Sequence, residues 1–248
     1  MRVLLRVAYD GTAYSGWQIQ PNVVTVEKKL TEALTDLFKC SIELTGASRT
    51  DAGVHAMGNV AVFDVETQIP AEKISYALNT RLPDDIKVVE SREVPAGFHP
   101  RHTDCIKTYE YTVWNNRFEN PCMRLYSYFY YGNLDIDKMN EAAFFIKGEH
   151  DFTAFCSADT QVVDKVRNIT DISVTKDGSI IRIRVTGNGF LYNMVRIIAG
   201  TLLYVGRGLM KPLDVKKAIE SKDRQLAGPT APAKGLTLME IRYKELNE

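Results

Sequence analysis

Apolar residues in the first hundred positions follow two periods, which predict four strands and two helices. The segment Thr25–Lys39 has apolar residues at positions 26, 30, 33, 34, 37 and 38, the spacing of one helical face. A second helix is expected over 69–83, with Pro70 near its start and Pro83 just past its end. Runs rich in β-branched residues predict strands over 3–10, 41–46, 58–66 and 85–94. The predicted order is therefore β-α-β-β-α-β.

The rest of the chain predicts a similar order. Strands are expected over 105–115 and 125–132, a helix over 134–148, and a hairpin over 168–189. Asp177 and Gly178 are a strong turn signal between the two β-rich runs of that hairpin. A mostly apolar helix, a shorter helix and a final strand complete the pattern, over 190–208, 213–221 and 236–246.

Two such halves, residues 1–104 and 105–248, predict an α/β (α+β) protein. Each half has the order of a ferredoxin-like unit, which is also the layout of RNA-recognition domains. We find no residue-level repeat between the halves. If their sheets join, the open face suits an extended ligand.

Composition narrows the class of protein. The chain has 248 residues and a formal net charge of zero, so nothing in the total charge indicates a nucleic-acid partner, although a local basic cleft could still bind phosphates. Its four cysteines are scattered without a C-x-x-C pair, which argues against a zinc site or a disulfide framework and for reduced thiols in the cytosol. The short apolar run at the N-terminus is broken by Arg6 and predicts no signal peptide, and no stretch is as long as a membrane span.

The stretch GASRTDAGVHA (46–56) places Asp51 among small residues, two positions after Arg49. One interpretation is a plain turn, because Asp bonds to nearby backbone groups and Gly53 accepts a positive φ. The other is a reactive carboxylate that a bulky ligand can approach closely. Arg49 would keep it ionised, and an ionised Asp can act as a nucleophile or a base. We assign no role to His55, since a lone histidine usually packs or caps.

Two other segments carry candidate chemistry. In the strand 105–115, the side chains of Lys107, Tyr109, Tyr111 and Val113 share one face. Their aromatic rings could fill a core, or one tyrosine could stack on a base. Arg196 interrupts an apolar helical run, where it either extends to solvent or pairs with a carboxylate such as an aspartate.

The segment FHPRHTD (98–104) has two histidines three residues apart. Pro100 argues against a helix there, and no third ligand lies nearby, so we do not expect a metal. Arg101 is a plausible phosphate contact.

Taken together, these motifs resemble the bacterial tRNA pseudouridine synthase A family nearly end to end. The resemblance rests on YDGTAYSGWQIQPN, GASRTDAGVHA, NTRLPDDIKV, FHPRHTDCIKTYEY, HDFTAFCS, GFLYNMVRIIAG and GPTAPAKGLTL, in that order. One departure is Ser48, where the family usually has glycine; serine is small enough to be accommodated.

The resemblance implies the pseudouridine synthase fold, with two sheets joined around a central cleft. It implies a cytoplasmic homodimer that isomerises uridine to pseudouridine at positions 38, 39 and 40 of the tRNA anticodon stem-loop, with no metal, nucleotide or organic cofactor. It also implies that one tRNA touches both subunits. The apolar helix 190–208 adds a reason to expect a dimer, because it offers more apolar surface than one helix contact consumes.

The same resemblance implies roles for individual residues. Asp51 matches the catalytic aspartate, and Tyr109 matches the tyrosine that packs on the target base. Arg49 and Arg196 match basic residues near the aspartate, with Arg196 as its salt-bridge partner. The loop Asp10–Asn22 and Arg101 lie in segments similar to RNA-contacting regions of the family.

Two rival functions remain at this point. A non-catalytic RNA-binding module would use the same sheets and would not require Asp51. A hydrolase of nucleosides or glycosides would more naturally use a second acid close to the first, and the motif offers only Asp51.

Overall fold

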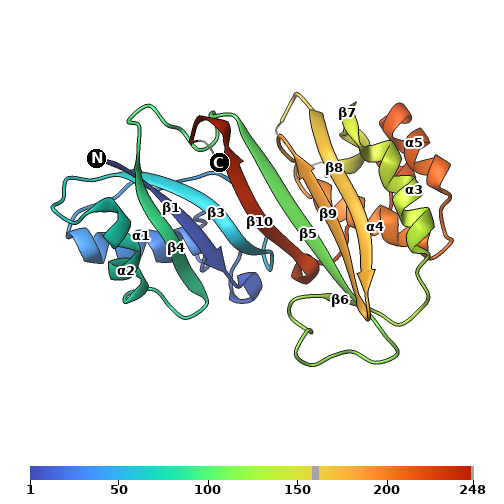
Figure 1. The fold of residues 1–248 in the computed structure, drawn as a ribbon, viewed down its shortest axis with the longest axis horizontal. Coiled ribbons are helices and arrows are strands. Elements are labelled where there is room, and N and C mark those ends of the chain that lie inside the picture. The colour runs from blue at the N-terminus through green and yellow to red at the C-terminus, as the bar shows by residue number, and fades with distance from the viewer. Residues whose placement is uncertain (158–161, 247–248) are drawn as a thin grey trace. The chain divides into compact units, whose positions relative to one another are not determined.

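The computed structural model describes residues 1–157 and 162–246, and the chain divides into two compact units (Figure 1). The first unit is Met1–Cys105 together with Thr237–Glu248, and the second is Ile106–Leu236. This division puts the last strand with the first unit, because that strand pairs there. Among the described residues, no helix has the length and apolar content that a bilayer crossing requires.

The first unit is built on an antiparallel sheet. Its strands β4 (Ile86–Val94), β1 (Arg2–Tyr9) and β3 (His55–Asp64) lie side by side in that order. The other edge of β3 is shared along its length: β2 (Thr45–Gly46) pairs antiparallel with residues 61 and 62, and β10 (Leu236–Tyr243) pairs parallel with residues 55 and 56. The order β4-β1-β3-β2 is that of a ferredoxin-like unit, as predicted.

Helix α1 (Val26–Phe38) follows the predicted pattern closely. The side chain of Thr25 accepts a hydrogen bond from the Lys28 amide and caps the first turn, and Lys39 ends the helix in a left-handed conformation. Leu30 and Leu34 are fully buried, and the ring of Phe38 lies 5.9 Å from that of Phe63 on β3. The apolar face of α1 is therefore part of the core.

Two predicted elements are shorter than expected. Helix α2 covers only Ile74–Asn79, because Asn79 turns its side chain to the backbone of Val88, accepting from the amide and donating to the carbonyl at 2.8 and 2.9 Å. Strand β2 begins only at Thr45, since Ser41 and Glu43 are exposed and unpaired with β3.

The second unit has a sheet with the order β5-β9-β8-β7. These strands are β5 (Cys105–Asn115), β9 (Ile180–Gly187), β8 (Val166–Asp177) and β7 (Gly148–Asp151). The predicted hairpin is confirmed: β8 and β9 pair antiparallel around Gly178, which has a φ of 55°. Strand β6 (Tyr128–Tyr130) pairs in parallel with the end of β5. Strand β7, only four residues long, was not predicted.

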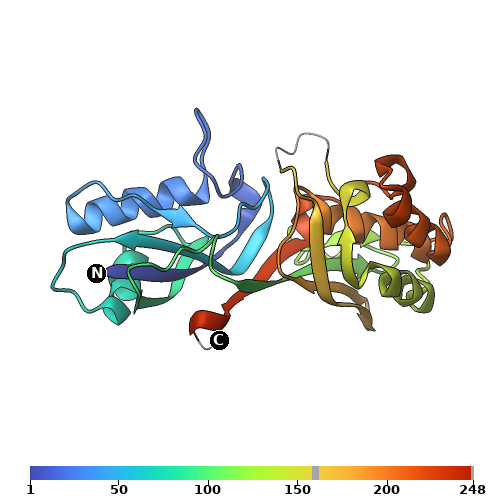
Figure 2. The same ribbon diagram turned by 90° about the horizontal axis from the view of Figure 1, so that it is seen from above.

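Three helices lie together on one side of this sheet, as both ribbon views show (Figures 1 and 2). They are α3 (Ile136–Ile146), α4 (Met194–Gly206) and α5 (Pro212–Ser221). Helix α4 starts later than predicted because Asn193 has a φ of 60°. Every aliphatic side chain of α4 is buried. The expectation that this helix presents surplus apolar surface to a second copy is therefore wrong.

The segment 228–231 crosses α4 at a point where two glycines permit close approach. A Cβ on Gly200 would collide with the carbonyl oxygen of Pro229, and one on Gly228 would come within 2.6 Å of the Cα of Thr201. The Gly228 amide donates a 2.8 Å hydrogen bond to the Thr201 hydroxyl. This crossing determines where Ala231 lies.

We expect Gly200→Ala to destabilise the protein by about 1–3 kcal/mol, because the added methyl group has no space beside Pro229. Urea unfolding measures this change. Gly97→Ala is the control, since a Cβ there has no neighbour within 4 Å. A gain of about 1 kcal/mol for Gly200→Ala, the usual effect in an exposed helix, would contradict this packing.

Candidate active site

Asp51 lies in the loop between β2 and β3, in the turn that the sequence predicted. The Val54 amide donates to the Asp51 carbonyl at 3.1 Å, and Gly53 has a φ of 77°, which is typical of a type II turn. Asp51 is partly exposed, whereas Thr50 and Val54 on either side are buried. The turn therefore presents the carboxylate from a fixed backbone.

A second loop packs directly against this turn. The Trp17 amide donates to the Thr50 carbonyl at 3.0 Å, and the Gly53 amide donates to the Tyr14 carbonyl at 3.3 Å. Gly16 has a φ of 87°, and a Cβ there would collide with the Thr50 carbonyl oxygen. The loop Asp10–Asn22 thus fixes the backbone beside Asp51.

His55 has a structural contact, as expected for a lone histidine. It is buried, and its Nδ1 accepts a 3.0 Å hydrogen bond from the Gly11 amide. The same nitrogen lies 3.2 Å from a carboxylate oxygen of Asp10. His55 therefore holds the start of the Asp10–Asn22 loop against β3.

A buried polar network supports the other side of the turn. Asn59 is fully buried, and its side-chain amide donates to the Ser48 carbonyl at 3.0 Å and to the Tyr9 hydroxyl at 3.3 Å. The Tyr9 hydroxyl lies 2.8 Å from the Thr50 hydroxyl. Asn59 and Tyr9 thereby hold the residues on both sides of Arg49. Neither residue was predicted to support the site, and the only signal in the sequence was an asparagine within an apolar strand.

Arg49 and Arg101 lie near one another in the first unit. The Arg101 Nε donates to the Gly46 carbonyl at 2.7 Å. Burial lowers the pKa of Arg101, the charge of Arg49 lowers it further, and the carboxylate of Glu27 opposes both effects. Arg49 is exposed and forms no ion pair with any residue in 1–157 or 162–246. Two cations thus lie near one another, one of them two residues before Asp51 in the sequence.

Tyr109 lies on β5 in the second unit, with Tyr111 and Val113 on the same buried face. Its ring is 7% exposed and meets the ring of Phe190 edge to face, with centroids 5.1 Å apart. Tyr111 is deeper: its hydroxyl donates to the Pro232 carbonyl at 2.9 Å, and burial raises its pKa. Both tyrosines are buried, and of the two only Tyr109 retains any solvent exposure.

Arg196 is fixed by neighbours on both sides. Its Nε donates to the Ala231 carbonyl at 2.8 Å, and its Nη1 donates to the Asn193 side chain at 2.9 Å. The Ala231 amide donates back to the Arg196 carbonyl at 3.0 Å. These bonds orient the guanidinium rather than leaving it to extend freely into solvent. Asp51 belongs to the first unit and Arg196 to the second, and their pairing stays a prediction.

The two histidines of the segment 98–104 lie together, with ring centroids 4.1 Å apart. The Nδ1 of His99 accepts from the Arg101 amide at 3.2 Å, and burial followed by the charge on His102 lowers the pKa of His99. In the part of the chain that the structure describes, no three His, Cys, Asp or Glu side chains come together as metal ligands.

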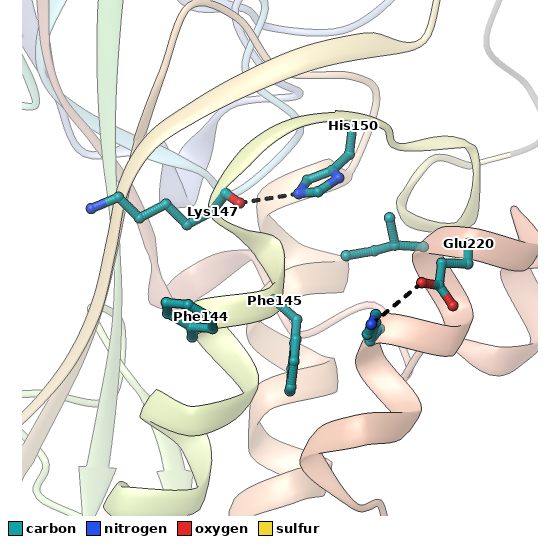
Figure 3. Close-up of a pocket in the computed structure, with 7 residues that line it drawn as sticks. Phe144, Phe145, Lys147, His150 and Glu220 are labelled. Carbon is teal, nitrogen blue, oxygen red and sulfur yellow. Dashed lines mark hydrogen bonds and ion pairs between the residues drawn. The ribbon is translucent and has the colours of Figure 1, made fainter.

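A pocket of about 350 Å³ lies in the second unit and includes none of the predicted site residues (Figure 3). Phe145 and Ile219 contribute apolar surface to the pocket. The Nε2 atom of His150 lies at hydrogen-bond distance, 3.0 Å, from the Lys147 carbonyl oxygen. Lys216 and Glu220 form an ion pair beside them. The candidate chemistry of Asp51, Tyr109 and Arg196 is therefore independent of this pocket.

The sequence is similar to known proteins over nearly its whole length. A family model described as tRNA pseudouridine synthase matches residues 6–102 and 142–244. The tRNA pseudouridine synthase A of Thermoanaerobacter sp. (strain X514) is 46% identical over 97% of this chain and 99% of its own, and that of Bacillus subtilis (strain 168) is 45% identical over 98% and 99%. The tRNA pseudouridine synthase A 2 of Clostridium tetani is 48% identical over 97% and 98%. A solved archaeal box H/ACA Nop10–Cbf5 complex aligns at 12% identity over 91% and 70%, with a TM-score of 0.34.

We expect Asn59→Ala to lower both stability and turnover, because it removes the donor that holds Ser48 beside the Asp51 turn. Loss of a buried hydrogen-bonded amide costs about 1–3 kcal/mol in urea unfolding. Asn79→Ala is a matched control: it also removes a side chain that bridges backbone groups of this unit, but at Val88. Equal turnover of the two variants at saturating substrate would argue against a specific role for Asn59.

Proposed function

This chain belongs to the tRNA pseudouridine synthase family and isomerises uridine to pseudouridine in tRNA, and we propose that it acts at positions 38, 39 and 40 of the anticodon stem-loop with Asp51 as the catalytic carboxylate. The observation that carries the proposal is the Asp51 turn. Hydrogen bonds from Trp17, Asn59 and Tyr9 fix its flanking residues, while Asp51 itself is partly exposed. A carboxylate held in this way is pre-organised for reaction.

The reaction breaks the bond from ribose C1′ to uracil N1, turns the base, and joins C1′ to C5. Breaking a glycosidic bond develops positive charge on the sugar, which a carboxylate stabilises. Asp51 can attack C1′ directly, or it can remove a ribose proton to form a glycal; both routes place it against the sugar. C5 must then lose its proton while the freed N1 gains one, and Asp51 or the Tyr109 side chain is the candidate base for C5.

Tyr109 is the proposed platform for the target base. A paired or stacked uridine must leave the stem to reach a carboxylate, which costs a few kcal/mol. Stacking on an aromatic ring offsets part of that cost and keeps the cleaved uracil from escaping. The edge-to-face contact with Phe190 supports this role, because it holds the Tyr109 ring in one orientation.

Arg49 and Arg101 are the proposed phosphate contacts near the target nucleotide. Burial lowers the pKa of Arg101, and the nearby charge of Arg49 lowers it further. A phosphate bound between them would offset the repulsion between the two charges and accept charge-assisted hydrogen bonds. Such contacts make tRNA binding weaken as salt increases.

Arg196 is the proposed salt-bridge partner of Asp51. Its Nε and one Nη hydrogen bond within the second unit, to Ala231 and Asn193. An ion pair with Arg196 would keep the Asp51 carboxylate ionised and oriented. We further propose a cytoplasmic homodimer that works without a metal or an organic cofactor, on the family resemblance alone.

Asp51→Ala is expected to reduce pseudouridine formation by about a thousandfold or more, while tRNA binding changes little. Tritium release from tRNA carrying 5-tritiated uridine measures turnover, and a filter-binding titration measures affinity. Asp64→Ala is the control, because it removes an exposed carboxylate of the same unit. Pseudouridine made by Asp51→Ala would show that the chemistry lies elsewhere, and free uracil among the products would indicate a hydrolase.

Light scattering at working concentration is expected to give twice the chain mass of 28.0 kDa. The same mass is expected with Asp51→Ala, since the turn is not proposed as a subunit contact. A monomeric mass for the parent would remove the dimer from the proposal without affecting the catalytic role of Asp51.

A further inference from the structure

Three tyrosines and one arginine form a partly exposed cluster at the C-terminal end of α4, here called the tyrosine–arginine patch. It consists of Tyr130, Tyr131, Tyr204 and Arg207. The Arg207 guanidinium carbon lies 5.3 Å from the ring centroid of Tyr130 and 5.4 Å from that of Tyr204. The rings of Tyr130 and Tyr131 are 5.9 Å apart, and Tyr131 is 78% exposed. Planar groups therefore gather on one surface of the second unit.

The patch has a rigid support. Tyr130 pairs with Asn115 in the parallel ladder between β6 and β5, and the Asn115 side chain donates to the carbonyls of Tyr130 and Gly132 at 2.9 and 2.7 Å. Gly206 packs closely on Met139 of α3, where a Cβ would come within 2.6 Å of the Met139 sulfur. Both sides of the patch are thus fixed before any partner arrives, which lowers the entropic cost of binding.

The charge of Arg207 favours an anionic partner. Of the residues described here, none forms an ion pair with Arg207, and its guanidinium contacts ring faces instead. A cation at a helix C-terminus interacts well with the helix dipole, which explains an arginine at this position. It does not explain the exposed ring of Tyr131. Aromatic rings combined with an arginine plane are the surface on which unpaired bases and phosphates bind.

We propose that the tyrosine–arginine patch binds tRNA outside the reaction pocket. This rests on the proposed function, in which Arg196 adjoins the target uridine. Arg196 and Arg207 are eleven positions apart on one helix, a rise of about 16 Å, so a nucleotide on the patch is not the one that reacts. Tyr130 and Tyr131 also lie between the two segments that the family model matches, 6–102 and 142–244.

The test measures the affinity for an unmodified full-length tRNA transcript in an Asp51→Ala background, so that turnover does not interfere. Arg207→Ala and Tyr131→Ala are each expected to raise Kd by about 5- to 20-fold. Loss of Arg207 should also reduce the slope of log Kd against log salt concentration by about one. Arg207→Lys keeps the charge without the planar group and should give an intermediate Kd.

Arg242→Ala is the control, because it removes an exposed arginine of the first unit that pairs with Glu240, and its Kd should equal that of the parent. Unchanged Kd values for both Arg207→Ala and Tyr131→Ala would overturn the proposal. So would a fall in mass by light scattering with these variants, which would identify the patch as a contact between copies. If Kd rises as expected but the enzyme with Asp51 makes no pseudouridine, the patch binds RNA and the proposed function fails alone.

Discussion

The Thr50 carbonyl oxygen is the point on which the arrangement around Asp51 depends. It accepts the Trp17 amide and lies so close to Gly16 that no side chain fits there. The Asp51 turn has few side chains large enough to hold it, because most of its neighbours are Gly, Ala or Ser. Backbone hydrogen bonds to a neighbouring loop provide the rigidity instead. Position 16 must therefore be glycine, because any side chain there would collide with the Thr50 carbonyl oxygen.

In the second unit, close packing of small residues orients Arg196. Arg196 interrupts an otherwise buried helix, and an arginine in that setting needs acceptors. One is supplied by Ala231, whose position follows from the close crossing of Gly228 over Gly200 and Thr201. Packing between small residues therefore sets the direction of a charged group. In both units, glycines allow the close backbone contacts that position the groups next to Asp51 and Arg196.

Much of this fold could be predicted because local periodicity and turn chemistry agree with the tertiary structure. Helix α1 and the hairpin β8–β9 are of this kind. Strand β7 could not be predicted, because its four residues are extended only by pairing with β8. The end of α2 was also hidden, since it depends on the bond between Asn79 and Val88.

The residues of the candidate site also differ in how far the sequence alone indicates them. Asp51, Arg49 and Arg101 stand in short motifs whose residue types suggest chemistry, so the sequence indicates them as candidates. The supports of the turn act across long separations: Asn59 reaches Tyr9, fifty positions earlier. A buried asparagine in a strand signals that a partner exists but does not say which. Tyr109 and Arg196 were found through family resemblance, because aromatic strands and charged residues in helices have many ordinary explanations.

The edge of β3 shared by β2 and β10 has a consequence for synthesis of the chain. Residues 237 and 238 complete the ladder next to His55 and Ala56, just after the Asp51 turn. A ribosome releases the whole of the second unit, 106–236, before it releases these residues. The sheet of the first unit can therefore be completed only after the rest of the chain has been made. A chain cut short before β10 would carry Asp51 on an unfinished sheet.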